Sequence, residues 1–232
     1  MKKKAMHRRE AIGVLGAAGA AAIAYGCGAA SASPTSPSTT TATTTGTNAA
    51  CAVTPTETAG PYPSLNDFFR SDIRDGKSGT ILTLTIRVVN VNSSCAPVSN
   101  ANVEIWHVDA AGTYSQYGTQ TTQTYLRGIQ TTNERGDVVF TTIYPGWYQG
   151  RATHIHAEVT IGGRSVKVTQ MAFPETVNNA VHATGVYASR GTNPMSNASD
   201  GIFADSLAAE LVTPTGDPTG GYSVTFQIGI GL

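Results

Sequence analysis

YPGWYQGRATHIH, at residues 144–156, combines a turn with the start of a segment in which residue types alternate. The alternation runs from His154 to Val159 and predicts a β-strand. Side chains two apart on a strand share a face, so His154 and His156 point to one side and Ile155 to the other. Two imidazoles on one face offer two neutral nitrogen lone pairs, which is typical of a metal site. An H-x-H pair alone is weak evidence, because many such pairs are incidental surface or hydrogen-bonded histidines.

Further segments with alternating, β-branched residues predict the rest of the fold. The predicted strands cover residues 80–91, 102–108, 137–143, 154–161, 164–173 and 221–230. Gly162-Gly163 predicts a two-residue hairpin turn, and the prolines of residues 54–63 exclude a regular interior strand there. Only residues 175–185 and 200–212 are candidate short helices. The expected fold class is all-β, an antiparallel β-sandwich with short helices.

Charge is distributed unevenly along the 232 residues, although 15 basic and 15 acidic residues give a formal net charge of zero. Five of the basic residues and one acidic residue lie in the first 26, which leaves 10 basic against 14 acidic. No basic patch is visible, and this argues against a nucleic-acid partner. The roughly 180 residues after position 50 are enough for one domain with a sizeable core.

The N-terminal segment has the composition of a targeting sequence. Residues 1–26 combine a basic start, an apolar stretch from Ala11 and a small residue before Cys27, which predicts an export signal. Arg8-Arg9 before the apolar run favours the twin-arginine route, with an ordinary secretory signal as the alternative. Residues 27–50 are rich in Ser and Thr and predict a disordered tether. Residues 51–232 are then expected to form the folded domain.

The cysteines fit an exported, anchored protein. The sequence from Ala24 to Cys27 resembles the cleavage site of bacterial lipoproteins, whose cysteine becomes lipidated. The chain has three cysteines, and exported proteins rarely leave a thiol unpaired. Lipidation of Cys27 leaves Cys51 and Cys95, consistent with one disulfide. Closing a loop of about 45 residues would stabilise the domain by about 3–4 kcal/mol. We therefore expect an exported protein, tethered to a membrane through Cys27.

Four motifs, in this order, resemble the intradiol ring-cleavage dioxygenases, which are non-haem iron(III) enzymes that split catechols. They are ETAGPYP at 57–63, VEIWH with DAAGTY at 103–114, PGWY with Arg151 and HIH at 145–156, and TQMAFP at 169–174. The resemblance covers roughly residues 53–230 and implies a β-sandwich with long active-site loops. It also implies an enzyme that uses Fe(III) and O2 to cleave a catechol between its hydroxyl-bearing carbons, giving a cis,cis-muconate-type product.

The resemblance implies a metal site with two phenolates and two imidazoles. The implied ligands are Tyr114, Tyr148, His154 and His156. This hard, anionic set suits Fe(III), and two tyrosinates with one hydroxide balance its charge. The family patterns D-x-x-G-x-Y and P-G-x-Y match Tyr114 and Tyr148, whereas the neighbouring Tyr117 and Tyr144 do not match.

Catalytic roles are implied for three residues. Arg151 would stabilise negative charge on the substrate, Gln170 would form hydrogen bonds within the pocket, and Tyr148 would leave the metal when substrate binds. The alternatives are a strand-edge surface charge for Arg151 and a solvent-facing strand residue for Gln170. His107 and His182 are expected to be structural.

The chain also departs from the family pattern. Only Gln149 and Gly150 separate Tyr148 from Arg151, a shorter loop than in better-known members, so we expect an open pocket. The helical dimerisation region of the catechol 1,2-dioxygenases is replaced here by the predicted signal and tether, and the sequence leaves the oligomeric state open. Two alternatives stay open at this point: a non-catalytic β-sandwich binding module of the cell surface, and the same site with another metal performing hydrolysis.

Overall fold

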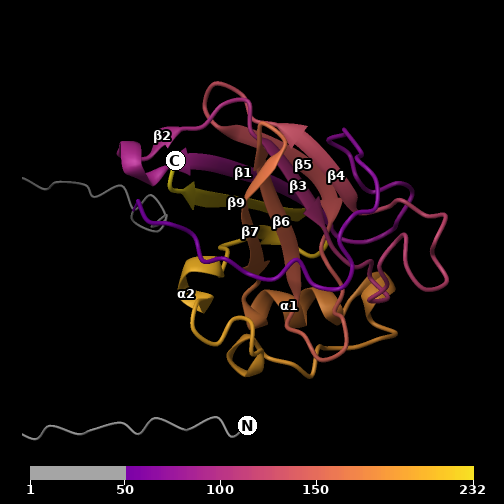
Figure 1. Ribbon diagram of the computed structural model, residues 1–232. Helices are drawn as coiled ribbons and strands as arrows, with labels where there is room; N and C mark the ends of the chain where they lie inside the picture. The colour runs from indigo at the N-terminus through magenta and orange to yellow at the C-terminus, as the bar shows by residue number, and fades with distance from the viewer. Residues whose placement is uncertain (1–50) are drawn as a thin grey trace, which may run out of the picture. The chain divides into compact units, whose positions relative to one another are not determined.

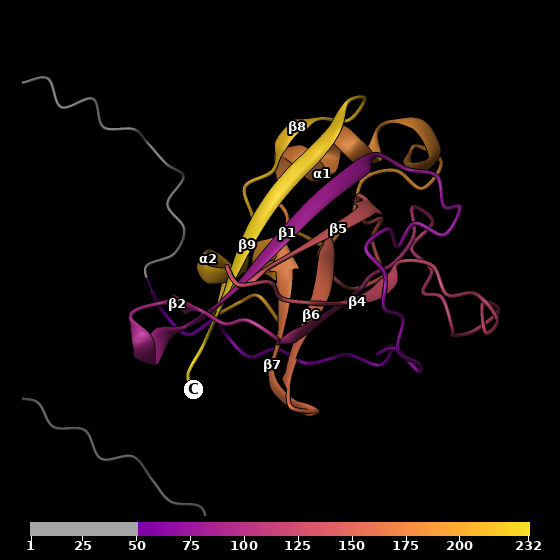
Figure 2. The same ribbon diagram turned by 90° about the horizontal axis from the view of Figure 1, so that it is seen from above.

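Two β-sheets pack face to face in the computed structural model, which describes residues 51–232 (Figure 1 and Figure 2). The predicted signal of residues 1–26, the tether of residues 27–50 and Cys27 lie outside the described residues and stay predictions. The β-sandwich expected from the sequence is confirmed for the described part of the chain.

The first sheet is built around β1, and the second contains the HIH segment. In the first sheet the order is β2 (Ala96–Pro97), β1 (Ile81–Asn90), β9 (Gly221–Ile230) and β8 (Thr215–Asp217), with β5 (Asp137–Ile143) also paired to β1. In the second the order is β4 (Arg127–Thr131), β3 (Asn102–Trp106), β6 (His154–Ile161) and β7 (Arg164–Ala172). Every pair of the second sheet is antiparallel.

One strand pair differs from the expected antiparallel arrangement. β1 and β9 run parallel over their whole lengths, from Leu82 beside Tyr222 to Asn90 beside Ile230. Parallel neighbours need a long connection rather than a hairpin, and the chain between β1 and β9 contains all the remaining strands and helices. The short strands β2, β4 and β8 were not predicted. β2 and β8 have only two and three residues, and β4 has five and contains Gly128, so none of them shows a clear alternation.

The two α-helices of the described residues are short and lie within the two predicted ranges, whereas the 3-10 helices lie partly or wholly outside them. α1 covers Glu175–His182 and α2 covers Leu207–Glu210, with 3-10 helices at Val91–Ser93, Gly185–Tyr187 and Asn197–Ser199. α1 begins directly after β7, with Pro174 in extended conformation and Glu175 in the first turn, where a negative charge is favourable. Within residues 51–232, no helix combines the length and the apolar character that crossing a membrane requires.

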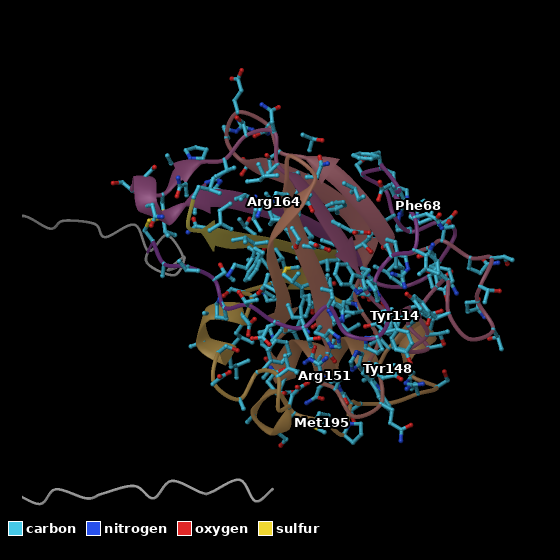
Figure 3. All side chains as sticks on the ribbon, in the orientation of Figure 1. Phe68, Tyr114, Tyr148, Arg151, Arg164 and Met195 are labelled. Carbon is cyan, nitrogen blue, oxygen red and sulfur yellow. A yellow bond between two sulfur atoms is a disulfide. The ribbon has the colours of Figure 1, made fainter. Side chains whose placement is uncertain are left out.

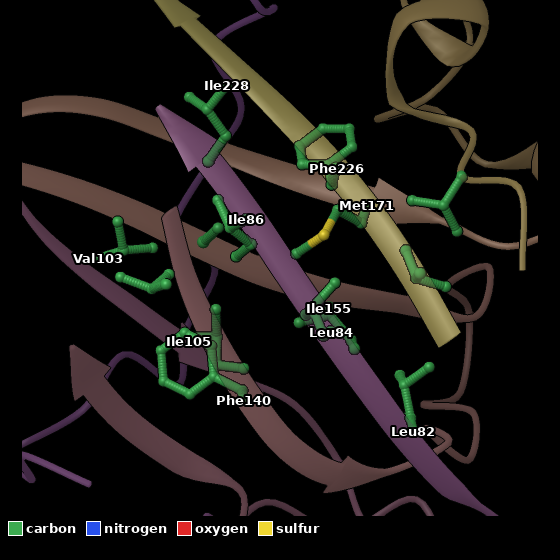
Figure 4. Close-up of a cluster of buried hydrophobic side chains, with 14 of the residues drawn as sticks. Leu82, Leu84, Ile86, Val103, Ile105, Phe140, Ile155, Met171, Phe226 and Ile228 are labelled. Atoms are coloured by element: carbon green, nitrogen blue, oxygen red, sulfur yellow. The ribbon is translucent and has the colours of Figure 1, made fainter. Parts of the chain in front are cut away.

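The core lies between the sheets and is formed by alternate residues of the central strands (Figure 4). Leu82, Leu84 and Ile86 of β1 are fully buried there. Ile155 and Ala157 of β6 face them from the second sheet and are also fully buried. The opposite face of β6 therefore carries His154 and His156, as the alternation predicts.

The N-terminal part of the domain crosses the outer face of the second sheet. Backbone hydrogen bonds join Glu57 to Val168 of β7 and Phe68 to Ile129 of β4. The indigo segment follows this course in Figure 1. The disulfide between Cys51 and Cys95 is present and ties the beginning of this segment to the region between β1 and β2. The predicted pairing is thereby confirmed.

Replacing Cys51 with Ser is expected to lower the free energy of unfolding by about 3–4 kcal/mol, because the bridge restricts the unfolded chain more than the folded one. Urea denaturation with and without a reducing agent measures the effect. The reductant should bring the wild-type midpoint to that of the variant and leave the variant unchanged. A wild-type midpoint that does not respond to complete reduction would contradict the expectation.

Candidate active site

The loop after β3 delivers Tyr114, and its motif residues shape the loop. The Asp109 carboxylate accepts two backbone N–H bonds within the loop, each 3.0 Å long. Gly112 has a φ of +76°, and a β-carbon there would lie 2.3 Å from the backbone oxygen of Trp147. Asp and Gly of the D-x-x-G-x-Y pattern are therefore needed for the turn and for its contact with the next loop.

A second loop, residues 144–148, carries Tyr148 and is held by hydrogen bonds from α1 and from the 3-10 helix Gly185–Tyr187. Its backbone oxygens accept hydrogen bonds from the Tyr187 hydroxyl at 2.6 Å and from Nε2 of His182 at 3.2 Å. The indole of Trp147 donates to the Gly191 oxygen at 2.9 Å. His182 thus has the structural position expected for it, buried beneath the loop.

Arg190 joins the two tyrosine loops, and no sequence pattern identified it. Its guanidinium carbon lies 3.9 Å from the centre of the Trp147 ring, a cation–π contact. The same guanidinium donates to the backbone oxygen of Ala111 at 2.7 Å. Because it contacts both loops, Arg190 supports their mutual position.

Three donor atoms converge between the loops and β6. Oη of Tyr114 lies 3.4 Å from Nε2 of His154, which lies 3.1 Å from Nε2 of His156. Ligand atoms bound to one metal ion at about 2.1 Å are separated by about 3.0–3.4 Å, so the three atoms have the spacing of ligands on one ion. Nδ1 of His154 donates to the Ala152 oxygen at 2.6 Å, which leaves its Nε2 with a free lone pair.

The protonation states also suit a cation. Burial lowers the pKa of His154 to about 4 and places the pKa of His156 well below its ordinary value, so both rings are neutral at neutral pH. Burial raises the pKa of the Tyr114 phenol, so its phenolate requires a nearby positive charge. No cluster of three or more His, Cys, Asp or Glu side chains that could hold a metal occurs within residues 51–232. A metal at this site would therefore depend on the tyrosines.

Tyr148 completes the set on the open side of the site. Its hydroxyl lies 2.8 Å from that of Tyr62, and its ring centre is 5.9 Å from that of Tyr114. All four predicted ligands line one cavity of about 490 Å³, together with Arg151 and residues of the Thr58–Tyr62 turn. The labelled Tyr114, Tyr148 and Arg151 gather in one region of Figure 3.

Tyr62 and Arg127 belong to the site but were not predicted as site residues. The fully buried Arg127 of β4 donates to the backbone oxygens of Tyr62 at 2.9 Å and of Ser115 at 2.8 Å. It therefore joins the turn that carries Tyr62 to the loop that carries Tyr114. The GPY motif pointed to the Tyr62 segment, whereas the short strand β4 carried no signal.

Arg151 and Gln170 form one hydrogen-bonded chain. Arg151 donates from Nε to Asp200 at 2.8 Å and from Nη2 to the Gln170 side-chain oxygen at 2.7 Å. Gln170 is fully buried and donates to the Thr58 oxygen at 2.8 Å. Neither residue is therefore a free surface side chain, and Gln170, which does not line the cavity, holds Arg151 in place. Asp200, from a loop distant in sequence, was not predicted.

The competing residues lie elsewhere. The Tyr117 hydroxyl donates to the Pro63 oxygen at 2.7 Å, and the Tyr144 hydroxyl donates within the core to Asn178 at 2.7 Å. His107 is buried between the Val108 oxygen and the Thr142 hydroxyl, each 2.8 Å away. None of the three lines the cavity.

Comparisons with known proteins agree with this geometry. A family model described as Dioxygenase matches residues 59–190, more than half of the chain. An intradiol ring-cleavage dioxygenase from Tetranychus urticae is 29% identical, with a TM-score of 0.69 over 78% of this chain and 95% of that chain. The dioxygenase domain of a dioxygenase–carbohydrate-binding protein fusion from Streptomyces sp. SirexAA-E is 27% identical, with a TM-score of 0.60 over 78% and 99%.

A more distant structure shares the fold. The 3-chlorocatechol 1,2-dioxygenase of Rhodococcus opacus 1CP is 21% identical, with a TM-score of 0.57 over 77% of this chain and 72% of that chain. The sandwich, the site and the family match together define an enzyme class. The chain belongs to the intradiol ring-cleavage dioxygenases, whose reaction is the cleavage of catechol-type rings. This assignment favours an enzyme over the binding module and the hydrolase that the sequence left open.

The packing of the two tyrosine loops can be tested by comparing Gly112→Ala with Gly150→Ala. Both glycines have positive φ, 76° and 82°, so each variant should lose about 1–2 kcal/mol through backbone strain. A β-carbon at Gly112 also meets Trp147, whereas at Gly150 nothing lies within 4 Å. The total loss at Gly112 should therefore reach about 2–5 kcal/mol. Guanidinium denaturation measures both values, and equal losses would show that the loops do not depend on this contact.

Proposed function

We propose that the protein is an exported iron(III) dioxygenase that cleaves catechols between the two hydroxyl-bearing carbons and gives a cis,cis-muconate-type product. The observation that carries the proposal is the convergence of Tyr114, His154 and His156 donor atoms in the cavity that Tyr148 also lines. Membership of the family supports the reaction type.

Tyr114, Tyr148, His154 and His156 would hold the iron. The donor set fits Fe(III), because two phenolates supply negative charge and two neutral imidazoles complete a hard coordination sphere. Bound there, Fe(III) would supply positive charge that lowers the phenol pKa values, binds the catecholate and prepares it for reaction with O2.

Tyr148 is suited to be the ligand that substrate displaces. The Tyr148 side chain is only partly buried, whereas Tyr114 is 6% exposed. The hydroxyl oxygen of Tyr148 already has a hydrogen-bond partner in Tyr62. The hydrogen bond with Tyr148 and partial burial raise the pKa of Tyr62, so the Tyr62 phenol keeps its proton and can donate a hydrogen bond to a Tyr148 phenolate. After displacement from the metal, the Tyr148 oxygen would therefore keep its hydrogen bond with Tyr62 and could accept a proton from the substrate.

Arg151 and the cavity walls orient the substrate. Arg151 lines the cavity with a guanidinium fixed by Asp200 and Gln170, so its position beside the reacting ring is preorganised. The cavity volume of about 490 Å³ is in the range that accommodates drug-sized ligands. Catechol, with about eight non-hydrogen atoms, is much smaller than such ligands. Ring-substituted catechols therefore fit.

Export is supported by the disulfide. A bridge between Cys51 and Cys95 persists only in an oxidising compartment, which agrees with a signal at residues 1–26. Residues 27–50 would then hold the enzyme at a distance from a membrane to which Cys27 is anchored by lipid.

The iron site is tested by the colour of the protein. Iron-loaded wild type is expected to be burgundy red, because charge transfer from phenolate to Fe(III) absorbs visible light. Tyr148→Phe should lose much of the absorption and most of the turnover, and His154→Ala should lose the iron itself. Visible spectra, metal analysis and ring-cleavage assays with catechol measure these effects.

Tyr117→Phe and Tyr144→Phe are the matched controls and should stay coloured and active. Tyr144→Phe leaves the buried Asn178 oxygen without its partner, so it should cost about 1–3 kcal/mol of stability without affecting the colour. A colourless iron-replete wild type would refute the proposal, as would bleaching by Tyr117→Phe but not by Tyr114→Phe. Ring opening next to the hydroxyls would indicate a different reaction class.

The lipid anchor is tested by cell fractionation. Wild type is expected in the membrane fraction, and Cys27→Ser should be released in soluble form, because the thiol that receives the lipid is absent. Mass spectrometry of the mature N-terminus provides the second measurement. Two soluble proteins that begin at the same residue would exclude an anchor at Cys27.

A further inference from the structure

Asp200 is a buried charged side chain next to the cavity residue Arg151, and its role is not explained by the proposed chemistry. It is 1% exposed and accepts hydrogen bonds from Nε of Arg151 at 2.8 Å and from the amide of Ala152 at 2.6 Å through one oxygen. Its other oxygen accepts the amide of Ile202 at 2.9 Å. Burial alone would raise the pKa of Asp200, but these amides and the Arg151 charge together lower it, so it is ionised.

The pairing determines the charge that a ligand meets. Arg151 is the only residue with a permanent charge among those that line the cavity within the described part of the chain. Asp200 forms a salt bridge with it at 2.8 Å, so the pair together carries no net charge. Arg127 is fully buried and held by Tyr62 and Ser115, and it does not line the cavity.

Two further carboxylates lie on the same side as Asp200. Glu57 precedes the lining residue Thr58 and is 3.4 Å from the hydroxyl of Ser206, and the exposed Asp205 is the neighbour of Ser206. No cation of residues 51–232 forms a salt bridge with either carboxylate. Neither carboxylate lines the cavity, so a negative group on a bound ring would meet a guanidinium that is already paired with Asp200.

We propose that Asp200 is a specificity-determining residue: by neutralising Arg151 it makes the cavity select catechols with uncharged substituents and reject those with a carboxylate. The inference rests on the proposed function and narrows its substrate class. Asp200 acts through Arg151 rather than by touching the ring, so it is also a positioning residue. A carboxylate in such a site is disfavoured because it loses part of its hydration without gaining an unpaired cation.

The test compares 3,4-dihydroxybenzoate with its methyl ester, which differ by one negative charge. Anaerobic titration of the iron-loaded enzyme, followed by the change in its visible spectrum, gives each Kd without turnover. In wild type the acid should bind at least about tenfold more weakly than the ester. In Asp200→Asn this ratio should fall at least about threefold, because the Arg151 charge is no longer cancelled.

A second pair makes the test independent of the variant. 3,4-Dihydroxyphenylacetate and its methyl ester should show the same preference in wild type, whether or not Asp200→Asn folds. Equal Kd values for acid and ester in wild type would overturn the inference while leaving the iron site intact, as would an unchanged ratio in a folded Asp200→Asn. If neither catechol perturbs the spectrum of iron-loaded protein, the proposed function itself fails.

Discussion

The register of β6 is the constraint on which both the core and the site depend. Ile155, Ala157 and Val159 fill the space between the sheets, and the alternate residues His154 and His156 lie on the other face. A shift of one residue against β3 would exchange these two sets, placing imidazoles in the core and aliphatic chains in the cavity. The apolar residues of β6 fix the register, because a slip that removes them from the core would cost a large free energy. The positions of the two imidazoles follow from core packing before any metal is bound.

The tyrosines are positioned by a different principle, the packing of loop against loop. Gly112 allows the 109–114 loop to approach Trp147, and Gly146 allows the second loop to approach Asp109, where a β-carbon would lie 2.4 Å from the backbone oxygen. Loops are usually the variable part of a sandwich, but here the conformation of each loop depends on close packing against the other. Strand register and loop packing together bring residues 40 positions apart, Tyr114 and His154, to within 3.4 Å.

Sequence reasoning succeeded where a residue's role is expressed locally. Alternation identified the long strands, and the family patterns in DAAGTY and PGWY distinguished Tyr114 and Tyr148, which line the cavity, from Tyr117 and Tyr144, which do not. It failed where the determinant is a distant partner. β4 is five residues long and contains Gly128, so it has no periodic pattern, yet it carries the buried Arg127. Asp200 and Arg190 lie in irregular segments, where no spacing connects them to Arg151 or Trp147. The parallel pairing of β1 with β9 likewise depends on topology rather than on composition.

Two of the residues that sequence reasoning missed, Arg127 and Asp200, share a physical character. Both are buried charged side chains whose partners are mostly backbone groups of the segments that surround the cavity. Burying such groups is unfavourable unless every donor and acceptor is paired, so each one constrains several segments at once. The apolar core can fix the strands, but it cannot fix loops that must stay open to a ligand. A network of paired polar groups can do so, and because its members are charged, the same network that holds the loops also sets the electrostatic character of the cavity.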